Sequence, residues 1–242
     1  MKLKIKKTVE ITSIDLWKHY APPMDGETQW KDGRSAMSLA QFMLDKNQIK
    51  KLEAKFSSLG YNVRGEVLCT PEANTPLPGK GNGRNHDLLM IGNDFVAGIE
   101  SKVTEPFGNT IGKEVSKASA NKQLRIDTLV KELFNCEISE DIEDLRYQLL
   151  TGAVGTLFEA IRNNKCKALF LVIVFTDSIT AADEKQISKN NQDFADFCKF
   201  LGLKECGGTK KVLNIDLTIS KMEVSLNENN ASLLYSRSSS KD

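Results

Sequence analysis

Two short apolar runs in the middle of the chain, residues 84–91 and 95–103, are separated by turn-forming residues 92–94. Apolar runs of this length bounded by Gly, Asn and Asp predict β-strands, and the short break between them predicts a hairpin. Side chains alternate between the two faces of a strand. Glu100 and Lys102 are therefore expected to project from the same face.

Asp87 falls on that face in either of two simple registers of the hairpin. A two-residue loop pairs Asp87 with Gly98, and a four-residue loop pairs it with Glu100. A three-residue loop without a bulge would place it on the other face, because a slip of one residue exchanges the faces. We expect Asp87 opposite Glu100 or one diagonal step away. Gly98, on the same face, would leave room for an ion or a substrate backbone.

The rest of the chain alternates helical and extended patterns. Apolar residues at helical spacing predict helices over 35–43, 48–59, 115–134, 139–161 and 191–201. Extended patterns predict strands over 1–12, 61–70, 167–176, 211–219 and 222–226, with a weaker one over 231–235. Residues 17–34 and 71–85 are predicted to be loops, and 236–242 a polar tail. This order predicts an α/β fold.

Segment 167–176 is apolar on both faces, which predicts a buried central strand that runs parallel to a neighbour. Glu72, in the predicted loop before Asp87, is the favoured further acid near the hairpin, ahead of Glu66 and Glu53. Trp17 and Trp30 are expected to pack in the core rather than to stack on bases.

Composition narrows the class of protein. The 242 residues carry a net charge of +1 and are 40% hydrophobic, as expected of one globular domain. We expect a core over about residues 35–200, an N-terminal extension over 1–34, and C-terminal strands and a tail over 203–242. Five cysteines without paired spacing and two distant histidines argue against a disulfide framework and against a zinc site. No segment is apolar enough to span a membrane or act as a signal peptide, so the cytoplasm is the expected location.

Two carboxylates and a lysine on one strand face are an arrangement suited to Mg²⁺, which binds hard oxygen ligands and keeps several waters. The ion lowers the pKa of a bound water and neutralises phosphate charge, while a lysine can orient that water or act on its proton. Cross-strand ion pairs on a surface hairpin are the alternative. Apolar residues on both faces of residues 84–91 and 95–103 favour a central hairpin, where unpaired charge is costly without a function.

Asp87 followed by Glu100-Ser101-Lys102 on the next strand resembles the PD-(D/E)XK nuclease superfamily, with His86 where the superfamily's name has proline. Further stretches resemble an uncharacterised bacterial family of such domains, namely residues 29–36, 75–79, 100–108 and 145–150. The resemblance covers roughly residues 15–200. It implies a restriction-endonuclease-like core, a central mixed β-sheet flanked by helices, and Mg²⁺-dependent cleavage of nucleic acid with Mn²⁺ as substitute.

The resemblance implies a role for each candidate residue. Asp87 and Glu100 would hold the metal, with Glu72 as an outer ligand, and Lys102 would act on the attacking water. Gln148 would contact phosphate or a metal-bound water. The residues expected to contact nucleic acid are Lys80, Arg84, Lys113, Lys117 and Arg146.

The expected substrate is DNA in preference to RNA, in restriction or phage defence. Many such enzymes form a homodimer to cut both strands. Two alternatives stay open from sequence: a binding module of the same fold without catalysis, and a structural component of a defence complex. In the second, the three charged residues of the hairpin would form only an ion-pair cluster.

Overall fold

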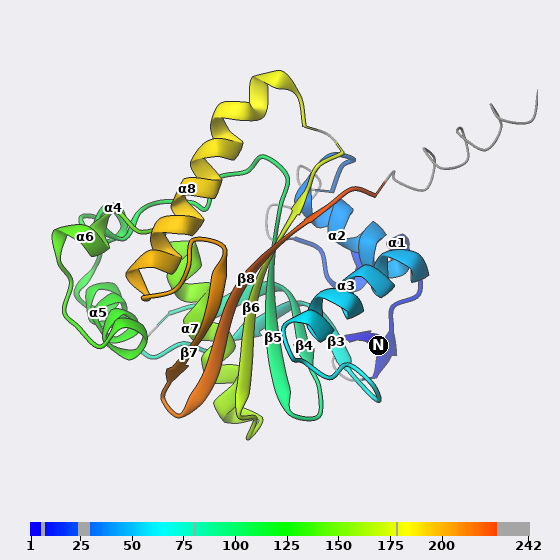
Figure 1. The fold of residues 1–242 in the computed structure, drawn as a ribbon, viewed down its shortest axis with the longest axis horizontal. Coiled ribbons are helices and arrows are strands. Elements are labelled where there is room, and N and C mark those ends of the chain that lie inside the picture. Colours follow the sequence, from blue (N-terminus) through cyan, green and yellow to red (C-terminus); the bar gives the residue numbers. More distant parts are fainter. Residues whose placement is uncertain (6–7, 24–29, 80, 178, 227–242) are drawn as a thin grey trace, which may run out of the picture.

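The computed structural model describes residues 1–5, 8–23, 30–79, 81–177 and 179–226. One eight-stranded sheet crosses the molecule in the order β2-β1-β3-β4-β5-β6-β8-β7 (Figure 1). Its strands are β1 (Lys2–Ile5), β2 (Val9–Glu10), β3 (Leu68–Thr75), β4 (Arg84–Ile91), β5 (Phe95–Lys102), β6 (Lys167–Phe175), β7 (Gly207–Val212) and β8 (Ile215–Val224).

The sheet is mixed, and its centre is parallel. Strand β6 runs parallel to both of its neighbours, β5 and β8, and its residues are almost all buried. The buried central strand predicted over 167–176 is thereby confirmed. Strand β4 is antiparallel to both of its neighbours, β3 and β5, and β1 pairs with β3 in parallel. The hairpin of β4 and β5 is thus central in the sheet.

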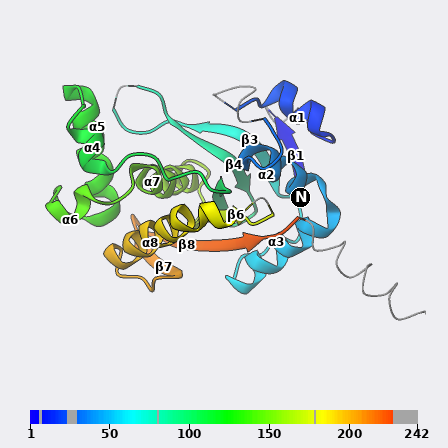
Figure 2. The same ribbon diagram turned by 90° about the horizontal axis from the view of Figure 1, so that it is seen from above.

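Helices cover both faces of the sheet, as Figures 1 and 2 show. One group consists of α1 (Ile14–Tyr20), α2 (Ser35–Leu44) and α3 (Lys46–Ser58). The other consists of α4 (Ile111–Val115), α5 (Ala120–Phe134), α6 (Glu140–Glu143), α7 (Tyr147–Arg162) and α8 (Glu184–Phe200), with a 3-10 turn at Ala181–Asp183. The protein is therefore an α/β molecule with three layers.

Successive side chains of β5 point to opposite faces of the sheet and pack with different helical layers. Phe95, Ala97 and Ile99 pack with the α1–α3 group, whereas Val96 packs with α7. All are fully buried. Burying an apolar side chain of this size stabilises the fold by roughly 1.5–3 kcal/mol. Strand β5 is thus fixed from both sides, which is why the residues at its end have little freedom.

Several predicted boundaries were wrong for local reasons. The predicted loop 17–34 begins inside α1, whose first turn is capped by the Ser13 side chain accepting from the Leu16 N–H. Trp17 and Trp30 are buried in the core, as predicted. The predicted helix 115–134 begins later than expected, at Ala120, because Ser119 caps the start of α5. The helix predicted over 139–161 is divided into two helices, α6 and α7.

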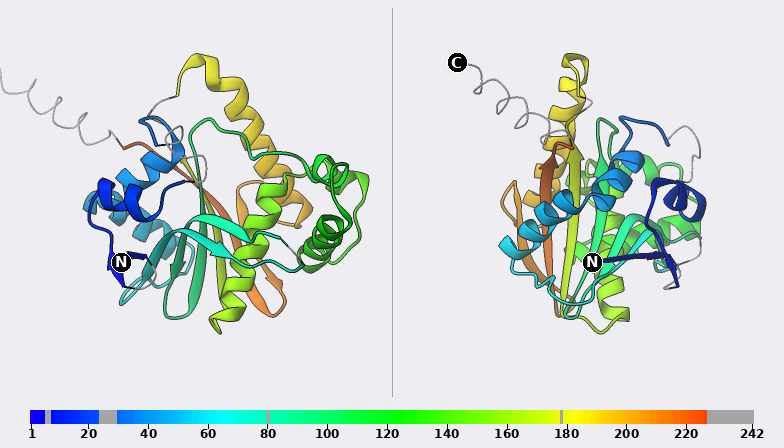
Figure 3. Two further views of the ribbon diagram at one scale, coloured as in Figure 1. Left: turned by 180° about the vertical axis from the view of Figure 1, so that it is seen from behind. Right: turned by 90° about the vertical axis from the view of Figure 1, so that its right-hand side faces the viewer.

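The predicted strand 61–70 is displaced toward the C-terminus. Gly65 has φ +98° and interrupts the extended run, so β3 begins at Leu68 and continues to Thr75 in what was predicted to be a loop. Helix α3 ends as predicted at Gly60, which has φ +80°. The weak strand 231–235 and the tail 236–242 lie outside the described residues. In Figure 3 the N-terminal strand β1 lies near one edge of the sheet and the β7–β8 hairpin lies at the opposite edge.

Candidate metal centre and adjoining cleft

The β4–β5 hairpin has the register that a four-residue loop gives. Ile91 pairs with Val96 and Leu88 with Ile99, which is the last pair of this ladder. Asp87 comes directly after it and contacts Ser101, the residue next to Glu100. The Gly92 N–H donates to the Phe95 carbonyl at 3.0 Å and closes the turn. The register of a four-residue loop, one of the two considered from sequence, is therefore confirmed over the pairs from Leu88–Ile99 to Ile91–Val96.

The sheet is interrupted where Asp87 lies. Between β3 and β4, Pro71 pairs with Leu88 and Ala73 with His86. Glu72 and Asp87, which lie between these pairs, form no backbone pair in the ladder. Glu72 has φ 46°, a left-handed conformation that is uncommon for a residue with a side chain. Irregularities of this kind redirect side chains and often lie beside functional sites. Here the irregularity places two carboxylates from adjacent strands at one position.

Asp87 is held by the strand opposite it. Its Oδ2 accepts from the Ser101 N–H at 2.7 Å and from the Ser101 hydroxyl at 2.6 Å. Within the described residues these are its only hydrogen bonds, so Oδ1 is available to a ligand. Burial, followed by the charge of Glu100, raises the pKa of Asp87 to about 6. The carboxylate is therefore oriented but not neutralised by a cation in direct contact.

Glu100 lies between two cations. It forms an ion pair with Arg84 through Oε2 and with Lys102 through Oε1, the latter at 2.7 Å. Burial alone would raise the pKa of Glu100, but the charges of Arg84 and Lys102 outweigh it and lower the pKa. The Lys102 ammonium also lies 5.5 Å from the centroid of the Phe107 ring. Glu100 is thus ionised and Lys102 is fixed beside it.

Glu72 completes the group of acids, although it lies in β3 rather than in the predicted loop. Burial raises its pKa to about 8, and the charges of Asp87 and Glu100 add to the rise. Its carboxylate has no hydrogen bond or ion pair with any described residue. The competing candidates lie elsewhere: Glu66 pairs with Lys2 at the surface, and Glu53 belongs to α3 on the other side of the sheet.

Gly98 does not leave room for an ion, contrary to the expectation from sequence. A Cβ at this position would lie 2.1 Å from Thr156 Oγ1 of α7 and 2.7 Å from His86 Nδ1. The glycine therefore allows α7 to approach the sheet. His86 fills the same space, is completely buried, and its pKa is lowered well below the ordinary value by burial and by Arg84. A neutral packing residue thus precedes Asp87.

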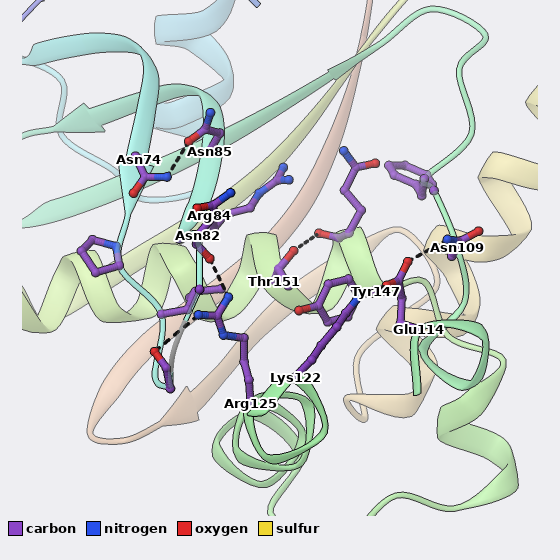
Figure 4. A pocket seen from close by; sticks show the side chains of 18 residues that line it. Asn74, Asn82, Arg84, Asn85, Asn109, Glu114, Lys122, Arg125, Tyr147 and Thr151 are labelled. Atoms are coloured by element: carbon purple, nitrogen blue, oxygen red, sulfur yellow. Dashed lines mark hydrogen bonds and ion pairs between the residues drawn. The ribbon is translucent and has the colours of Figure 1, made fainter. Parts of the chain in front are cut away.

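A cleft of about 1090 Å³ opens beside the acidic residues. Its walls are the β3–β4 connection, the segment 107–109, helices α4 and α5, and the first turns of α7 (Figure 4). Arg84 lines the cleft and pairs with Glu100, and Phe107 lines it and contacts Lys102. Cleft and charged residues are therefore parts of one region.

The residues predicted to contact nucleic acid are divided by the structure. Arg84 and Gln148 line the cleft, whereas Lys113 and Lys117 are exposed and do not. Arg146 is buried, forms an ion pair with Asp193 at 2.8 Å and donates to the Gly108 carbonyl at 2.8 Å, so it fixes the neighbouring segments. Lys80 lies outside the described residues.

Sequence reasoning missed one contributor and left two others open. Ser101 orients Asp87, and its place between Glu100 and Lys102 was the available signal. Lys122 and Arg125 of α5 line the cleft; from sequence their basic helix is a plausible element for phosphate contact, with a solvated, ion-paired face as the alternative. Arg125 donates to the carbonyls of Pro78 at 3.1 Å, Gly79 at 3.4 Å and Asn82 at 2.5 Å, and so ties the β3–β4 connection to α5.

Fold and site together define a class: an α/β protein in which a mixed sheet holds acidic and basic side chains at the end of a central hairpin, beside a polar cleft. The chain belongs to the family described as "Domain of unknown function (DUF6946)", which matches residues 10–227. Comparisons with curated proteins and with solved structures find no match. In the described part of the chain, none of the helices has the length and apolar character needed to cross a bilayer.

Proposed function

We propose that this protein is a divalent-metal-dependent nuclease, acting on DNA in preference to RNA, with a core of the PD-(D/E)XK type. One observation carries the proposal. Three acids from three adjacent strands lie next to Lys102 and an open cleft: Glu100 raises the pKa of Asp87, and Asp87 and Glu100 raise the pKa of Glu72. A buried group of carboxylates with raised pKa values is typical of functional sites.

The acids fit a hard divalent cation. Within the described residues, Asp87 Oδ1 and the Glu72 carboxylate have no hydrogen-bonding partner, and both pKa values are raised by burial and nearby negative charge. A bound cation would offset the nearby negative charge and lower the pKa values of both carboxylates. No ready-made cluster of three ligating side chains occurs among the residues described, which is compatible with Mg²⁺ because it often uses one or two carboxylates and keeps its waters.

Each neighbouring side chain then has a role. The bound ion would neutralise phosphate charge and make a water more acidic. Lys102, fixed by Glu100 at 2.7 Å, is placed to orient that water or take its proton. Arg84 has a buried Nε without a hydrogen-bond partner in the described structure and lines the cleft, so its remaining donors can bind a phosphate oxygen.

The arrangement of strands supports the finer fold assignment. Strands β3, β4 and β5 form an antiparallel unit, β6 lies parallel to β5, and α7 packs across them. The superfamily places its two acids and its lysine on such a unit. Asp87 lies in β4, and Glu100 and Lys102 lie in β5, which supports matching them to these residues of the superfamily.

A second candidate is a nucleic-acid-binding protein of the same fold without catalysis. The ion pairs of Glu100 with both Arg84 and Lys102 favour it, because they satisfy this carboxylate without a metal. In that case Asp87 and Glu72 would affect stability only.

Cleavage of plasmid and of labelled oligonucleotides in Mg²⁺ or Mn²⁺ separates the two candidates. The nuclease proposal expects metal-dependent cleavage that Asp87→Asn abolishes, because a ligand is lost. Lys102→Met should lower the rate by roughly 10²–10⁴-fold, the usual contribution of a proton-transfer group.

Glu53→Gln is the matched control, since it removes an acid on the opposite side of the sheet and should leave the rate unchanged. Cleavage that persists in purified Asp87→Asn protein would assign the activity to a contaminant. Absence of cleavage in the wild type over a range of metals and substrates would favour the second candidate.

A further inference from the structure

The wall of the cleft is rich in side-chain amides. Five of its side chains carry an amide group, namely Asn74, Asn82, Asn85, Asn109 and Gln148. Amides present a donor and an acceptor together, as the edges of nucleic-acid bases require. Some of them already bond to each other or to nearby carboxylates, such as Asn74 to Asn85 at 2.6 Å (Figure 4). The wall is therefore polar and held in place before a ligand binds.

One acceptor atom in this wall lacks a hydrogen-bond donor in the described structure. The Oε1 atom of Gln148 is buried and has no partner within the described structure. A buried acceptor without a partner is costly, and a ligand that donates to it offsets that cost. Phosphate oxygens only accept hydrogen bonds from protein groups. The donor that suits Gln148 is thus an N–H of a base or a sugar hydroxyl.

The charges and the aromatic ring of the cleft suit a strand of nucleic acid. Arg84, Lys122 and Arg125 are its cationic side chains in the described part, and Glu114 is its acid, already paired with Lys122. Tyr147, at the start of α7, presents an aromatic ring in the same cleft. A basic recess with an aromatic ring is the usual means of binding unpaired nucleotides.

The shape of the cleft favours an unpaired strand over a base-paired helix. Arg125 ties the β3–β4 connection to α5, so the recess is bounded on that side. Its volume of about 1090 Å³ is close to that of small-ligand sites. Duplexes are read by protruding helices or strands that enter a groove. A recess instead receives bases that have left the stack.

We propose that the cleft binds an unpaired stretch of a nucleic-acid strand, with its bases against the amide wall and its backbone leading past Arg84 to the three acids. The inference rests on the proposed function, since it names the form of the substrate. It makes the protein selective for single-stranded or locally opened nucleic acid.

Fluorescence anisotropy in chelator, where cleavage is blocked, tests this with three labelled probes: a single-stranded oligonucleotide, its duplex, and a single strand of abasic residues. The single strand should bind at least about tenfold more tightly than either other probe, because stacking and base contacts are lost in both. Equal or tighter binding of the duplex or of the abasic strand would overturn the inference.

Two lysines of equal charge provide a matched pair of variants. Lys122→Gln, which changes the cleft, should weaken single-strand binding by about tenfold, the worth of a hydrogen bond to a charged group. Lys113→Gln, at an exposed site outside the cleft, should leave binding within about twofold. With DNA probes, whose internal sugars have no free hydroxyl, Gln148→Leu should weaken binding of the normal strand by about fivefold and leave the abasic strand unaffected. Equal effects of the two lysine variants, with the fold intact by circular dichroism, would contradict the assignment of the cleft.

The binding and cleavage results are separable. Metal-dependent cleavage with preference for duplex would refute the inference and leave the nuclease proposal standing. Selective single-strand binding without cleavage in any metal would refute the nuclease proposal and leave the inference standing. Failure to bind any of the probes would refute the inference outright.

Discussion

Ionisation of single carboxylates is the most direct consequence of the site at the scale of residues. The pKa of Glu72 is raised to about 8 and that of Asp87 to about 6, from ordinary values of 4.5 and 3.8. The folded chain therefore binds these protons more tightly than the unfolded chain. Their stabilising contribution is complete below about pH 4 and is lost as the pH rises through about 6 and 8.

In the wild type, ionisation of Glu72 at high pH destabilises the folded state, because the carboxylate is buried near other acids. Glu72→Gln removes this ionisation. In metal-free buffer, the midpoint of thermal unfolding of Glu72→Gln relative to wild type should therefore rise as the pH increases from 5 to 9. Differential scanning fluorimetry at several pH values measures it. The surface variant Glu66→Gln should show no such rise, because Lys2 lowers the pKa of Glu66. A difference in unfolding midpoint between Glu72→Gln and wild type that stays constant with pH would contradict the raised pKa of Glu72.

The same residues show how far sequence can reach. Glu100, Lys102 and the register of Asp87 follow from strand alternation, which is a local rule. Glu72 joins them only because β3 pairs with β4 and is irregular at that point, which the sequence does not indicate. Arg84 was expected to contact phosphate, and its ion pair with Glu100 depends on distances across the sheet.

At the scale of elements, the close approach of α7 to the sheet positions the acids. Gly98 permits it, since a Cβ there would lie 2.1 Å from Thr156 Oγ1. Gly98→Ala should destabilise the protein by about 1–3 kcal/mol through overpacking. Thr156→Ala removes the obstructing hydroxyl together with its hydrogen bond to the Gly152 carbonyl.

A double-mutant cycle measures the coupling between β5 and α7. Gly98→Ala combined with Thr156→Ala should lose less stability in urea than the sum of the two single changes, by about 0.5–1.5 kcal/mol. Strict additivity of the two losses would show that α7 does not press on β5 at this position.

Helix boundaries were predictable where caps are local and not where helices break. Gly60 ends α3 as expected, with φ +80°. The start of α1 was missed, because the prolines and glycine that follow it favoured a loop although Ser13 provides a cap. The late start of α5 also follows from a serine cap, at Ser119, inside the run 115–134 that was predicted to be one continuous helix.

For the whole molecule, both helical layers share one sheet. Strands β5 and β6 contribute side chains to the core on each face. Neither layer can separate without exposing the apolar residues of the sheet. The architecture of alternating strands and helices was predictable from periodicity, whereas the order of strands was not, because it depends on contacts distant in sequence.

We therefore expect the two layers to unfold together. Both tryptophans of the chain lie in the α1–α3 layer, so their fluorescence reports that layer, whereas far-ultraviolet circular dichroism reports all helices. Urea unfolding followed by the two signals should give coincident transitions. A fluorescence transition that precedes the loss of helix would show that the layers unfold independently.

The central claim is that Glu72, Asp87 and Glu100 form a site for a divalent cation at the end of the hairpin. A crystal soaked in Mn²⁺ and measured for anomalous scattering tests it most directly. We predict a Mn²⁺ peak within bonding distance of Asp87 Oδ1 and of an oxygen of Glu72 or Glu100, at about 2.1–2.3 Å as for hard cations. Absence of a peak at these acids, with Arg84 still paired to Glu100 at a saturating concentration of Mn²⁺, would contradict the account.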